Sequence, residues 1–378
     1  MKNEVIKDTR FNRPFEYLEH QTDGITDNWH KARVFVLDRL INILNSAQTL
    51  PQAWHFVVKG DSDLLLSVVR NLVLYAHFTN YEEMYDCYDN LSCKNRTVIS
   101  LVTENNNIET KLKGIDYLGN FTDYCKLSVF GKKKNEDSYI DIELDIVKNE
   151  EDIIDAGSKP VIITEDIVQQ TIASKKPDDI FCIDIRKAIY ANEVYNLGTT
   201  IENIPYEDIN CAYRYRRALD TFKFKVLDSD FDVMKIKQKW ENEPQKVKLG
   251  ISNIICADCF EIREREITLL EKKEKLDSQM WEKHIEALAH CEHNRWIAEK
   301  LILGFKPLER EDRFGYEQLF GEQRNAFLKS LKTDADNPKH IDICSNRELR
   351  RRHPDNMKYD SFLMMAIPMI LAKTSKQD

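Results

Sequence analysis

Hydrophobic residues in the first part of the chain recur at two different spacings. In residues 29–46, Val36, Leu40, Ile43 and Leu44 lie on one side of a helix, which predicts an amphipathic helix. Four later segments are short, apolar and rich in β-branched residues, and each is bounded by polar turn residues, as buried strands are. They are residues 96–103, 126–130, 139–147 and 160–164.

The segment HFVVKGDSDLLLSVVRNLVLYAHF joins these two patterns. It predicts a short buried strand over 55–58, a tight turn at Gly60 and a helix over 62–77, which Asp61 or Ser62 caps. Strands that alternate with helices are typical of a parallel sheet covered by helices. The first half of the chain is therefore predicted to be an α/β domain with a Rossmann-like parallel sheet.

The pattern becomes helical from about Asp184 onward. A break is expected near Asp277, and Gly304 is expected to end the last long helix as a C-cap. The helical segments are 185–197, 209–219, 232–240 and 254–303, and the charged segment 241–250 is a hinge or a long loop. The chain is therefore predicted to have three parts. These are residues 1–180 with the N-terminal helix and the sheet, a mainly helical connector over 181–275, and a small helical domain over 276–378.

Composition and charge narrow the possible functions. The chain has 378 residues, of which 42% are hydrophobic and 31% charged, as in a soluble globular protein. The net charge of -9 makes nucleic acid an improbable partner, because binding to a phosphate backbone needs clustered cations. It leaves room for a small anion in a local basic pocket.

Several features of the sequence indicate a location in the cytoplasm. No apolar segment reaches the ~20 residues that span a bilayer, and the polar N-terminus lacks the apolar core of a signal peptide. Nine irregularly spaced cysteines indicate a reducing compartment. Cys256 and Cys259 form a single C-x-x-C pair without a matching second pair, so no metal site is expected.

The turn at Gly60 is the first candidate site. In a mononucleotide-binding fold, a glycine turn lets backbone N–H groups and a helix N-terminus approach a phosphate, so Gly60, Asp61 and Ser62 are candidate cofactor-binding residues. The turn has one glycine, and Asp61 and Asp63 place negative charge where a pyrophosphate would lie. The alternative is a plain turn between strand and helix. The sequence therefore does not identify a cofactor, and a nucleotide is the candidate.

The helical segment HIEALAHCEHNRWIAEKLILGFKP, residues 284–307, is the second candidate site. Helical spacing places Glu292, Trp296 and Glu299 on one face and pairs Arg295 with Glu299. An indole among ionisable groups of both signs suits a base or a cation. The alternative is that Trp296 only packs in the core and that the charges form a solvated face.

This segment resembles the opening helix of the ryanodine-receptor (RyR) repeat. The family pattern is a His or Glu-His pair followed by R-W, A-E-K and a glycine with an aromatic residue. The matching positions are Glu292, His293, Arg295, Trp296, Ala298, Glu299, Lys300, Gly304 and Phe305. Two later segments, HIDICSNREL (340–349) and YDSFLMMAIPMIL (359–371), are similar to the second half of the repeat, although Ile341 and Asn346 depart from its pattern.

The resemblance covers roughly residues 280–374, about a quarter of the chain. In addition, VVRNLVLYAHF is similar to the first helix of the TrkA-N type Rossmann domains that precede RyR-like modules in some bacterial proteins, where the loop is richer in glycine. RyR-like modules in bacteria occur beside nucleotide-signalling and phage-defence components. The resemblance thus implies a bacterial sensor or effector that binds a small nucleotide-derived ligand and forms a homo-oligomer.

The residues that this hypothesis assigns to ligand binding come from the three matching segments. They are His293, Arg295, Trp296, Glu299, Lys300, Phe305, His340, Arg347 and Tyr359. Two further basic segments are candidates: the first is either an anion-binding rim or a solvated helix face, and the second could contact a nucleotide, a partner surface or another domain. They are the cluster Arg347, Arg350, Arg351, Arg352 and Lys358, and the segment CAYRYRRALD at 211–220.

Two alternatives from other classes stay open. One is a nucleotide-processing or NAD-consuming enzyme centred near Gly60, and the other is a scaffold in which both domains only mediate assembly. The sequence has no G-x-S-x-G nucleophile motif, no Walker A motif and no H-E-x-x-H zinc motif, which favours a protein without catalytic activity.

Overall fold

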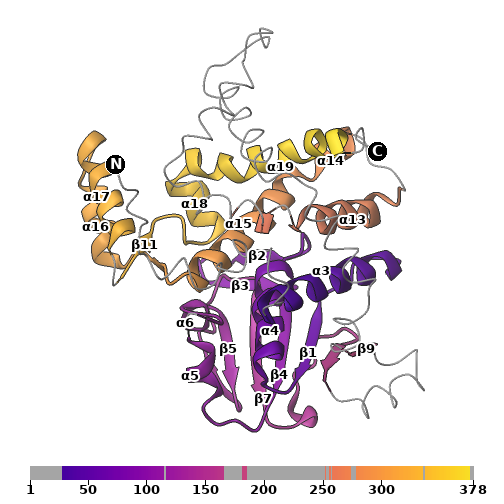
Figure 1. Ribbon diagram of the computed structural model, residues 1–378. Coiled ribbons are helices and arrows are strands. Elements are labelled where there is room, and N and C mark those ends of the chain that lie inside the picture. Colours follow the sequence, from indigo (N-terminus) through magenta and orange to yellow (C-terminus); the bar gives the residue numbers. More distant parts are fainter. Residues whose placement is uncertain are drawn as a thin grey trace, which may run out of the picture.

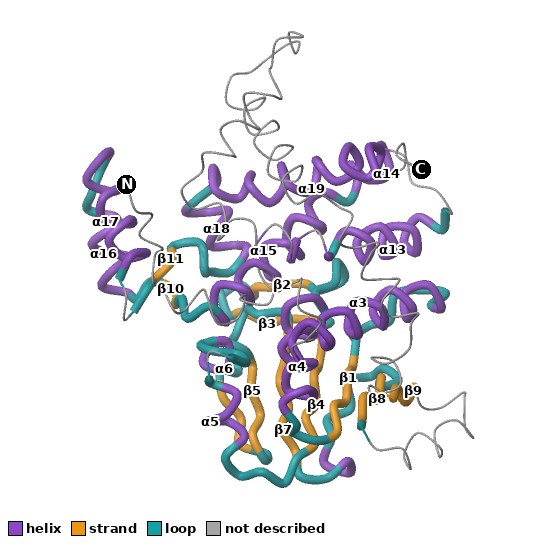
Figure 2. Tube along the Cα trace, viewed as in Figure 1, coloured by secondary structure: helices purple, strands orange, loops and turns teal. Residues whose placement is uncertain are grey.

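A computed structural model describes residues 28–114, 116–165, 181–184, 252, 255–256, 258–273, 278–334 and 337–374. Helices and a mostly parallel sheet make an α/β fold, as predicted (Figures 1 and 2). The predicted helices 185–197, 209–219 and 232–240, the hinge at 241–250 and the segment 211–220 lie outside the described residues. No helix among the described residues is both long enough and apolar enough to cross a membrane.

The main sheet has seven strands in the order β6-β5-β7-β4-β1-β8-β9. All neighbours run parallel except β6, which pairs antiparallel with β5. The strands are β1 (His55–Lys59), β4 (Thr97–Val102), β5 (Lys126–Val129), β6 (Lys132–Lys134), β7 (Ile142–Val147), β8 (Val161–Thr164) and β9 (Phe181–Asp184).

The five strands that the apolar segments predict are thus confirmed, although β7 starts three residues later than the predicted segment 139–147. The sequence reasoning missed β6, β9 and a separate antiparallel hairpin of β2 (Glu82–Tyr85) and β3 (Leu91–Lys94). The hairpin strands are polar and only partly buried, so they lack the continuous apolar pattern of a central strand.

The α-helices among the described residues are α3 (Asn28–Ser46), α4 (Asp63–Tyr75), α5 (Ile108–Leu112), α6 (Phe121–Tyr124), α13 (Phe260–Glu271), α14 (Ser278–Lys283), α15 (Ile285–Ile302), α16 (Arg310–Glu317), α17 (Gly321–Thr333), α18 (Asn346–Arg352) and α19 (Pro354–Thr374). Helix α4 packs on strands β1 and β4 of the sheet, and α3 and α15 pack on α4. Two short strands, β10 (Lys306–Pro307) and β11 (Lys339–His340), pair parallel beside α17.

The turn between β1 and α4 forms as its sequence predicts. Gly60 has φ +112°, a conformation that residues with a Cβ rarely adopt, and a Cβ added there would lie 2.8 Å from Leu65 Cδ1. Ser62 is the N-cap of α4, because its side chain accepts a hydrogen bond from Leu65 N–H. Every residue of α4 from Leu65 to Tyr75 is buried, since the helix lies between the sheet and the helices α3 and α15.

The helical stretch predicted over 254–303, with one break near Asp277, is interrupted twice. Lys272 has left-handed backbone angles and ends α13, and a second break at His284 separates α14 from α15. The break expected near Asp277 is confirmed, because α13 ends at Glu271 and α14 begins at Ser278. Gly304, with φ +86°, follows the last turn of α15, as its predicted role at the C-terminal end requires.

The C-terminal helices lie as a layer against the sheet part in Figure 1, and the two parts share one hydrophobic core. Asn120 N–H donates to Leu301 O at 3.0 Å, and its side chain donates to Gly304 O at 2.8 Å. Just before α13, the Asp258 carboxylate accepts two hydrogen bonds from Arg33 at 2.6 and 2.7 Å and one from Tyr75 at 2.8 Å. The helical part that holds the second candidate site is therefore fixed against the sheet.

Candidate functional site

A cavity of about 310 Å³ lies between α15, α17, α19 and the loop after β11. Five of the nine residues predicted to bind a ligand line it: His293, Arg295, Trp296, His340 and Tyr359. The other lining residues are Ser252, Cys256, Glu292, Lys332, Asp342, Leu349, Asn356, Asp360 and Leu363. The fold thus brings together residues that are up to about a hundred positions apart in the sequence.

Trp296 forms an aromatic wall of this cavity. Its side chain is half-buried, so the indole packs against the core and also faces the cavity. The His340 ring meets it edge-on at 4.8 Å between ring centroids, and the His293 ring lies nearly parallel to it at 6.1 Å. Lys300 Nζ lies 5.5 Å from the indole centroid, within the range of a cation–π contact.

Arg295 lies beneath the cavity and is only 1% exposed. Its guanidinium donates to both oxygens of Glu292, at 2.7 and 2.8 Å, and to Glu299 at 2.9 Å. Such a bidentate pair is geometrically specific. The charge of Arg295 is therefore compensated by two carboxylates of its own helix, and the guanidinium holds the floor of the cavity together.

Glu299 links this buried pair to the cavity wall. It accepts hydrogen bonds from Ser252 Oγ at 2.9 Å and from Lys300 Nζ. Burial opposes the charge of Glu299, but Lys300 and Arg295 outweigh burial and lower the pKa of the carboxyl to about 2. The two predicted residues Glu299 and Lys300 thus support the cavity from behind Trp296 and do not line it.

His293 is a buried cation in the lining of the cavity. Its Nδ1 lies 3.2 Å from Asp360 Oδ2, and its Nε2 lies 3.3 Å from the Cys344 carbonyl oxygen. Burial disfavours the charged ring, but the hydrogen bonds to Asp360 and Cys344 outweigh it and raise the pKa of His293 to about 10. At neutral pH the imidazole is therefore protonated and donates on both sides.

The rim of the cavity carries polar groups that can meet a ligand. Asn356 Nδ2 donates to Asp342 Oδ1 at 2.7 Å, and Asp342 N–H donates to His340 Nδ1 at 3.2 Å. Lys332 adds an exposed ammonium group. A cavity with an aromatic wall and amide, carboxylate and ammonium groups at its rim suits a planar molecule with a polar edge.

Like Glu299 and Lys300, the remaining two predicted residues lie away from the cavity lining. Phe305 is buried behind His340, with ring centroids 6.4 Å apart. Arg347 pairs with Asp89 at 2.6 Å and its guanidinium lies 4.3 Å from the Tyr85 ring centroid, on the β2–β3 hairpin. Arg347 therefore connects the helical part to this hairpin.

The turn at Gly60 lies at the carboxyl end of β1, beside the end of β8, where the strand order reverses direction. In open α/β sheets this is the place where ligands bind. Here Gly60 N–H donates to Val102 O at 2.9 Å. The Ser62 hydroxyl caps α4 and donates to Glu165 Oε2 at 2.7 Å. The Gly60 N–H and the Ser62 hydroxyl of this turn thus have partners within the protein.

Acidic side chains surround the same turn. Asp61 accepts from Asn105 Nδ2 at 2.7 Å, and Asp63 pairs with Lys111 at 3.0 Å. With Glu165, three carboxylates lie at or beside this turn, and Lys111 pairs with one of them. The charge distribution opposes a pyrophosphate at Gly60, Asp61 and Ser62.

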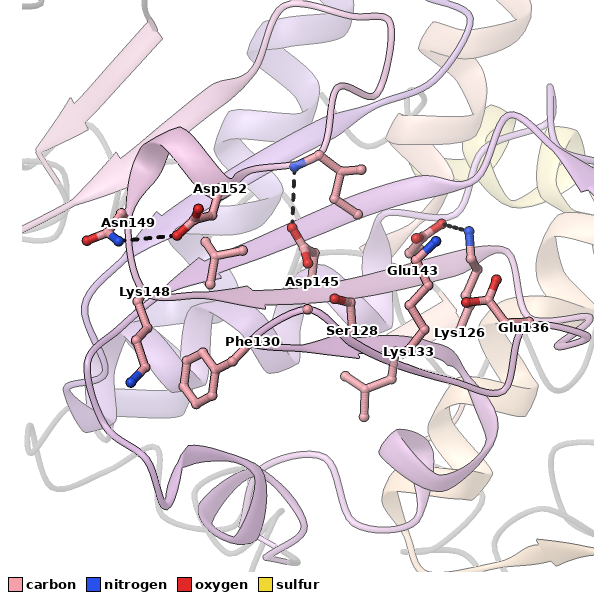
Figure 3. A pocket seen from close by; sticks show the side chains of 14 residues that line it. Lys126, Ser128, Phe130, Lys133, Glu136, Glu143, Asp145, Lys148, Asn149 and Asp152 are labelled. Carbon is pink, nitrogen blue, oxygen red and sulfur yellow. Dashed lines mark hydrogen bonds and ion pairs between the residues drawn. The ribbon is translucent and has the colours of Figure 1, made fainter.

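A larger cavity, of about 680 Å³, lies on β5 and β7 and the loops that follow them (Figure 3). Figure 3 shows Lys126 directed toward Glu143, with which it forms an ion pair at 2.9 Å. Asp145 is 2% exposed and accepts a weak hydrogen bond from Ile154 N–H at 3.4 Å. Burial raises the pKa of the Asp145 carboxyl, a property that is common at functional sites.

The sequence reasoning did not single out this cavity, although the alternation along β7 contains the signal. Ile142, Leu144 and Ile146 join the helix-covered core. Neighbouring side chains of a strand point to opposite faces, so Glu143 and Asp145 had to lie on the other face of the sheet. Acidic residues at alternate positions of a buried strand are unusual, because burial of a charge is costly.

The two cysteines of the C-x-x-C pair are buried, and burial raises the pKa of both thiols. Cys256 lines the cavity beside Trp296, whereas Cys259 packs in the core. Among the described residues, no three His, Cys, Asp or Glu side chains are grouped so that they could hold a metal ion.

Comparison with known proteins does not extend these observations. No protein-family model matches the chain, and no curated protein and no solved structure shows significant similarity to it.

Proposed function

We propose that this protein is a sensor or effector that binds a small nucleotide-derived molecule in the cavity beside Trp296. The observation that carries the proposal is that the half-buried indole of Trp296 lines a cavity whose rim holds Asn356, Asp342 and Lys332. An indole face stacks on any base, and the rim groups supply donors and acceptors for the polar edge of a base or a sugar.

The size of the cavity limits the ligand. Small-molecule pockets span roughly 300–1,000 Å³, so a cavity of about 310 Å³ is at the lower end of this range. It suits a nucleoside or a mononucleotide with its phosphate at the rim. The buried charges beneath the cavity are already paired, so specificity would come from the rim groups and the aromatic wall.

The resemblance of residues 280–374 to the RyR repeat supports a ligand-sensing role. The sheet order supports the accompanying Rossmann-like assignment, because without the β5–β6 hairpin the strands follow the order β7-β4-β1-β8-β9. This corresponds to 3-2-1-4-5 along the chain, the order that doubly wound nucleotide-binding sheets use. In this protein the sheet would serve as a scaffold, and the proposed setting is bacterial signalling or phage defence in the cytoplasm.

A ligand in the cavity could act on the sheet part through the segment that precedes α13. Ser252 and Cys256 line the cavity, and Asp258, two residues after Cys256, is bonded to Arg33 and Tyr75 of the sheet-covering helices. A ligand that binds one arrangement of this segment better than another shifts the population toward it. The response would be a change of domain arrangement or of homo-oligomeric state.

Isothermal calorimetry of the full chain with a panel of nucleosides, mononucleotides and dinucleotides tests the proposal. One member of the panel should bind, and Trp296→Ala should weaken binding about 5- to 150-fold, because stacking on a base is worth about 1–3 kcal/mol. The control Asp61→Ala, at the Gly60 turn, should leave the affinity unchanged. Absence of binding across the panel would favour a scaffold, and turnover of NAD or a nucleotide would favour the enzyme.

A further inference from the structure

A third cavity, of about 200 Å³, lies on the other side of the β11–α18 segment from the Trp296 cavity. His340 and Asp342 line the Trp296 cavity, whereas Ile341 between them lines this one. Helix α17 likewise contributes Lys332 to the first cavity and Arg324 to this one. The complete lining is Leu308, Arg313, Tyr316, Glu317, Arg324, Ile341, Glu348, Arg352 and His353.

Two of the three arginines in this cavity already have carboxylate partners. Arg313 pairs with Glu348 and donates to Leu308 O at 3.0 Å. Arg352 lies 3.4 Å from the same Glu348 and 3.6 Å from Glu317. The two glutamates of the lining are therefore shared between these two arginines.

Arg324 is held in a different way. Its guanidinium carbon lies 4.4 Å from the Tyr316 ring centroid and 5.4 Å from that of Phe320. Within the described part of the chain, no carboxylate forms an ion pair with Arg324, and its buried Nε has no hydrogen-bond partner. A guanidinium that lies against an aromatic ring keeps its N–H edge available for an anion.

His353 lines the same cavity as the three arginines, and their positive charges act on its imidazole ring. His353 meets Tyr316 edge-on at 5.7 Å between ring centroids. Burial lowers the pKa of His353, and the charges of Arg352, Arg313 and Arg324 lower it further, against the opposing effect of Asp342. The protonated imidazole is thus disfavoured in a cavity where three arginines face two glutamates, and a bound anion would relieve that repulsion.

We propose that this cavity is an anion site that binds a phosphate group of a small molecule, with Arg324 as its main ligand. A guanidinium matches phosphate with two parallel hydrogen bonds, and Arg324 lines the cavity without an ion pair to any described carboxylate. The volume of about 200 Å³ holds a terminal phosphate and leaves the rest of the molecule at the surface. This site is separate from the Trp296 cavity and does not depend on the proposed function.

Titration of the full chain with inorganic phosphate at constant ionic strength tests this site. Histidine NMR should show a saturable rise in the pKa of His353 with phosphate, because a bound anion favours the imidazolium, and sodium chloride should produce no such rise. In calorimetry, Arg324→Gln should weaken phosphate binding at least about tenfold, the loss expected for one charge-assisted contact. Arg351→Gln, an exposed arginine of α18 outside the cavity, should bind like the wild type.

Several results would overturn the assignment. These are the absence of a saturable response to phosphate, or an equal loss in Arg324→Gln and Arg351→Gln. If Arg324→Gln fails to fold, Arg324→Lys keeps the charge but loses the planar fork, and it should still weaken binding. Tighter binding of a phosphoserine peptide than of a small phosphate monoester would assign the cavity to a protein partner instead. Trp296→Ala should leave phosphate binding intact, which separates this site from the proposed function.

Discussion

The cavity beside Trp296 and the turn at Gly60 are both places where a helix brings charged side chains to the surface, but their charges are arranged differently. Under Trp296, Arg295 compensates Glu292 and Glu299 below the cavity floor, and the aromatic wall above stays accessible. At Gly60 the carboxylates of Asp61 and Glu165 accept hydrogen bonds from Asn105 and Ser62 at the turn itself.

A sequence motif therefore predicts a ligand-binding site only if its polar and aromatic groups can still contact a ligand in the folded protein. The Gly60 turn has the backbone conformation of a phosphate loop, yet its N–H donates to Val102 and the Ser62 hydroxyl caps α4. Trp296 packs against the core and still borders empty space. Availability is decided by the partners that the fold supplies, because a buried polar group without one is costly.

The largest effect is expected from breaking the buried charge cluster under Trp296. Arg295→Met should lower the free energy of unfolding by about 3–5 kcal/mol, because it leaves the buried carboxylate of Glu292 without its cation and that of Glu299 with Lys300 alone. Urea denaturation at pH 7 measures this loss. The control Arg350→Met, which removes an exposed pair with Glu286, should cost about 1 kcal/mol or less. Equal losses in the two variants would mean that the cluster is not a structural unit.

A smaller effect concerns His293 and depends on pH. Its pKa is raised in the folded protein from 6.5 to about 10, so its contribution to stability is fully present below pH 6.5 and is lost as pH rises toward 10. Asp360→Asn removes the main interaction that raises the pKa of His293. The stability of this variant should therefore decrease less than that of the wild type as pH rises. One proton contributes up to about 1.4 kcal/mol per pH unit.

Urea denaturation of both proteins between pH 7 and 9 compares the two slopes. Wild-type stability should fall more steeply with pH than that of Asp360→Asn. Parallel pH profiles would show that His293 does not carry this charge. No similar dependence is expected from the turn at Gly60, whose groups include no histidine.

The smallest effect is expected at the Gly60 turn, where the comparison predicts a structural role. Ser62→Ala should lower the free energy of unfolding by about 1 kcal/mol, the usual cost of losing an N-cap. Ser62→Thr retains the hydroxyl and should recover most of this loss in thermal denaturation. If Ser62→Ala left stability unchanged but abolished binding of a nucleotide, the turn would be a ligand site after all.

Parts of this fold were predictable because local patterns decide them. The apolar segments around Phe56, Ile99, Leu127, Leu144 and Ile163 predicted the strands of the sheet, since a strand buried on both faces needs a continuous apolar sequence. The turn at Gly60 and the cap at Ser62 also follow from their neighbours in the chain. The β2–β3 hairpin was missed because its half-exposed strands carry mixed residues.

The candidate sites were predictable only in part. The spacing of Arg295 and Glu299 predicted their ion pair, because residues four apart share a helix face, and five of the nine residues assigned to ligand binding line one cavity. Arg347 pairs instead with Asp89, which is 258 positions earlier in the chain. The Asp145 cavity and the arginines around His353 come from elements whose proximity no local pattern encodes.

Local sequence patterns were enough to predict the α/β class, five strands of the main sheet, the glycine turn and the charged face of the helix that carries Trp296. Three further features depend on the tertiary structure: Trp296 borders a cavity, the Arg295 ion pairs are buried, and Arg324 lies against aromatic rings. These two groups of features differ in how far apart in the sequence the interacting residues are. Backbone conformation and helix-face contacts depend on residues within a few positions, whereas burial, pairing of charges and empty space depend on segments that meet only when the chain has folded.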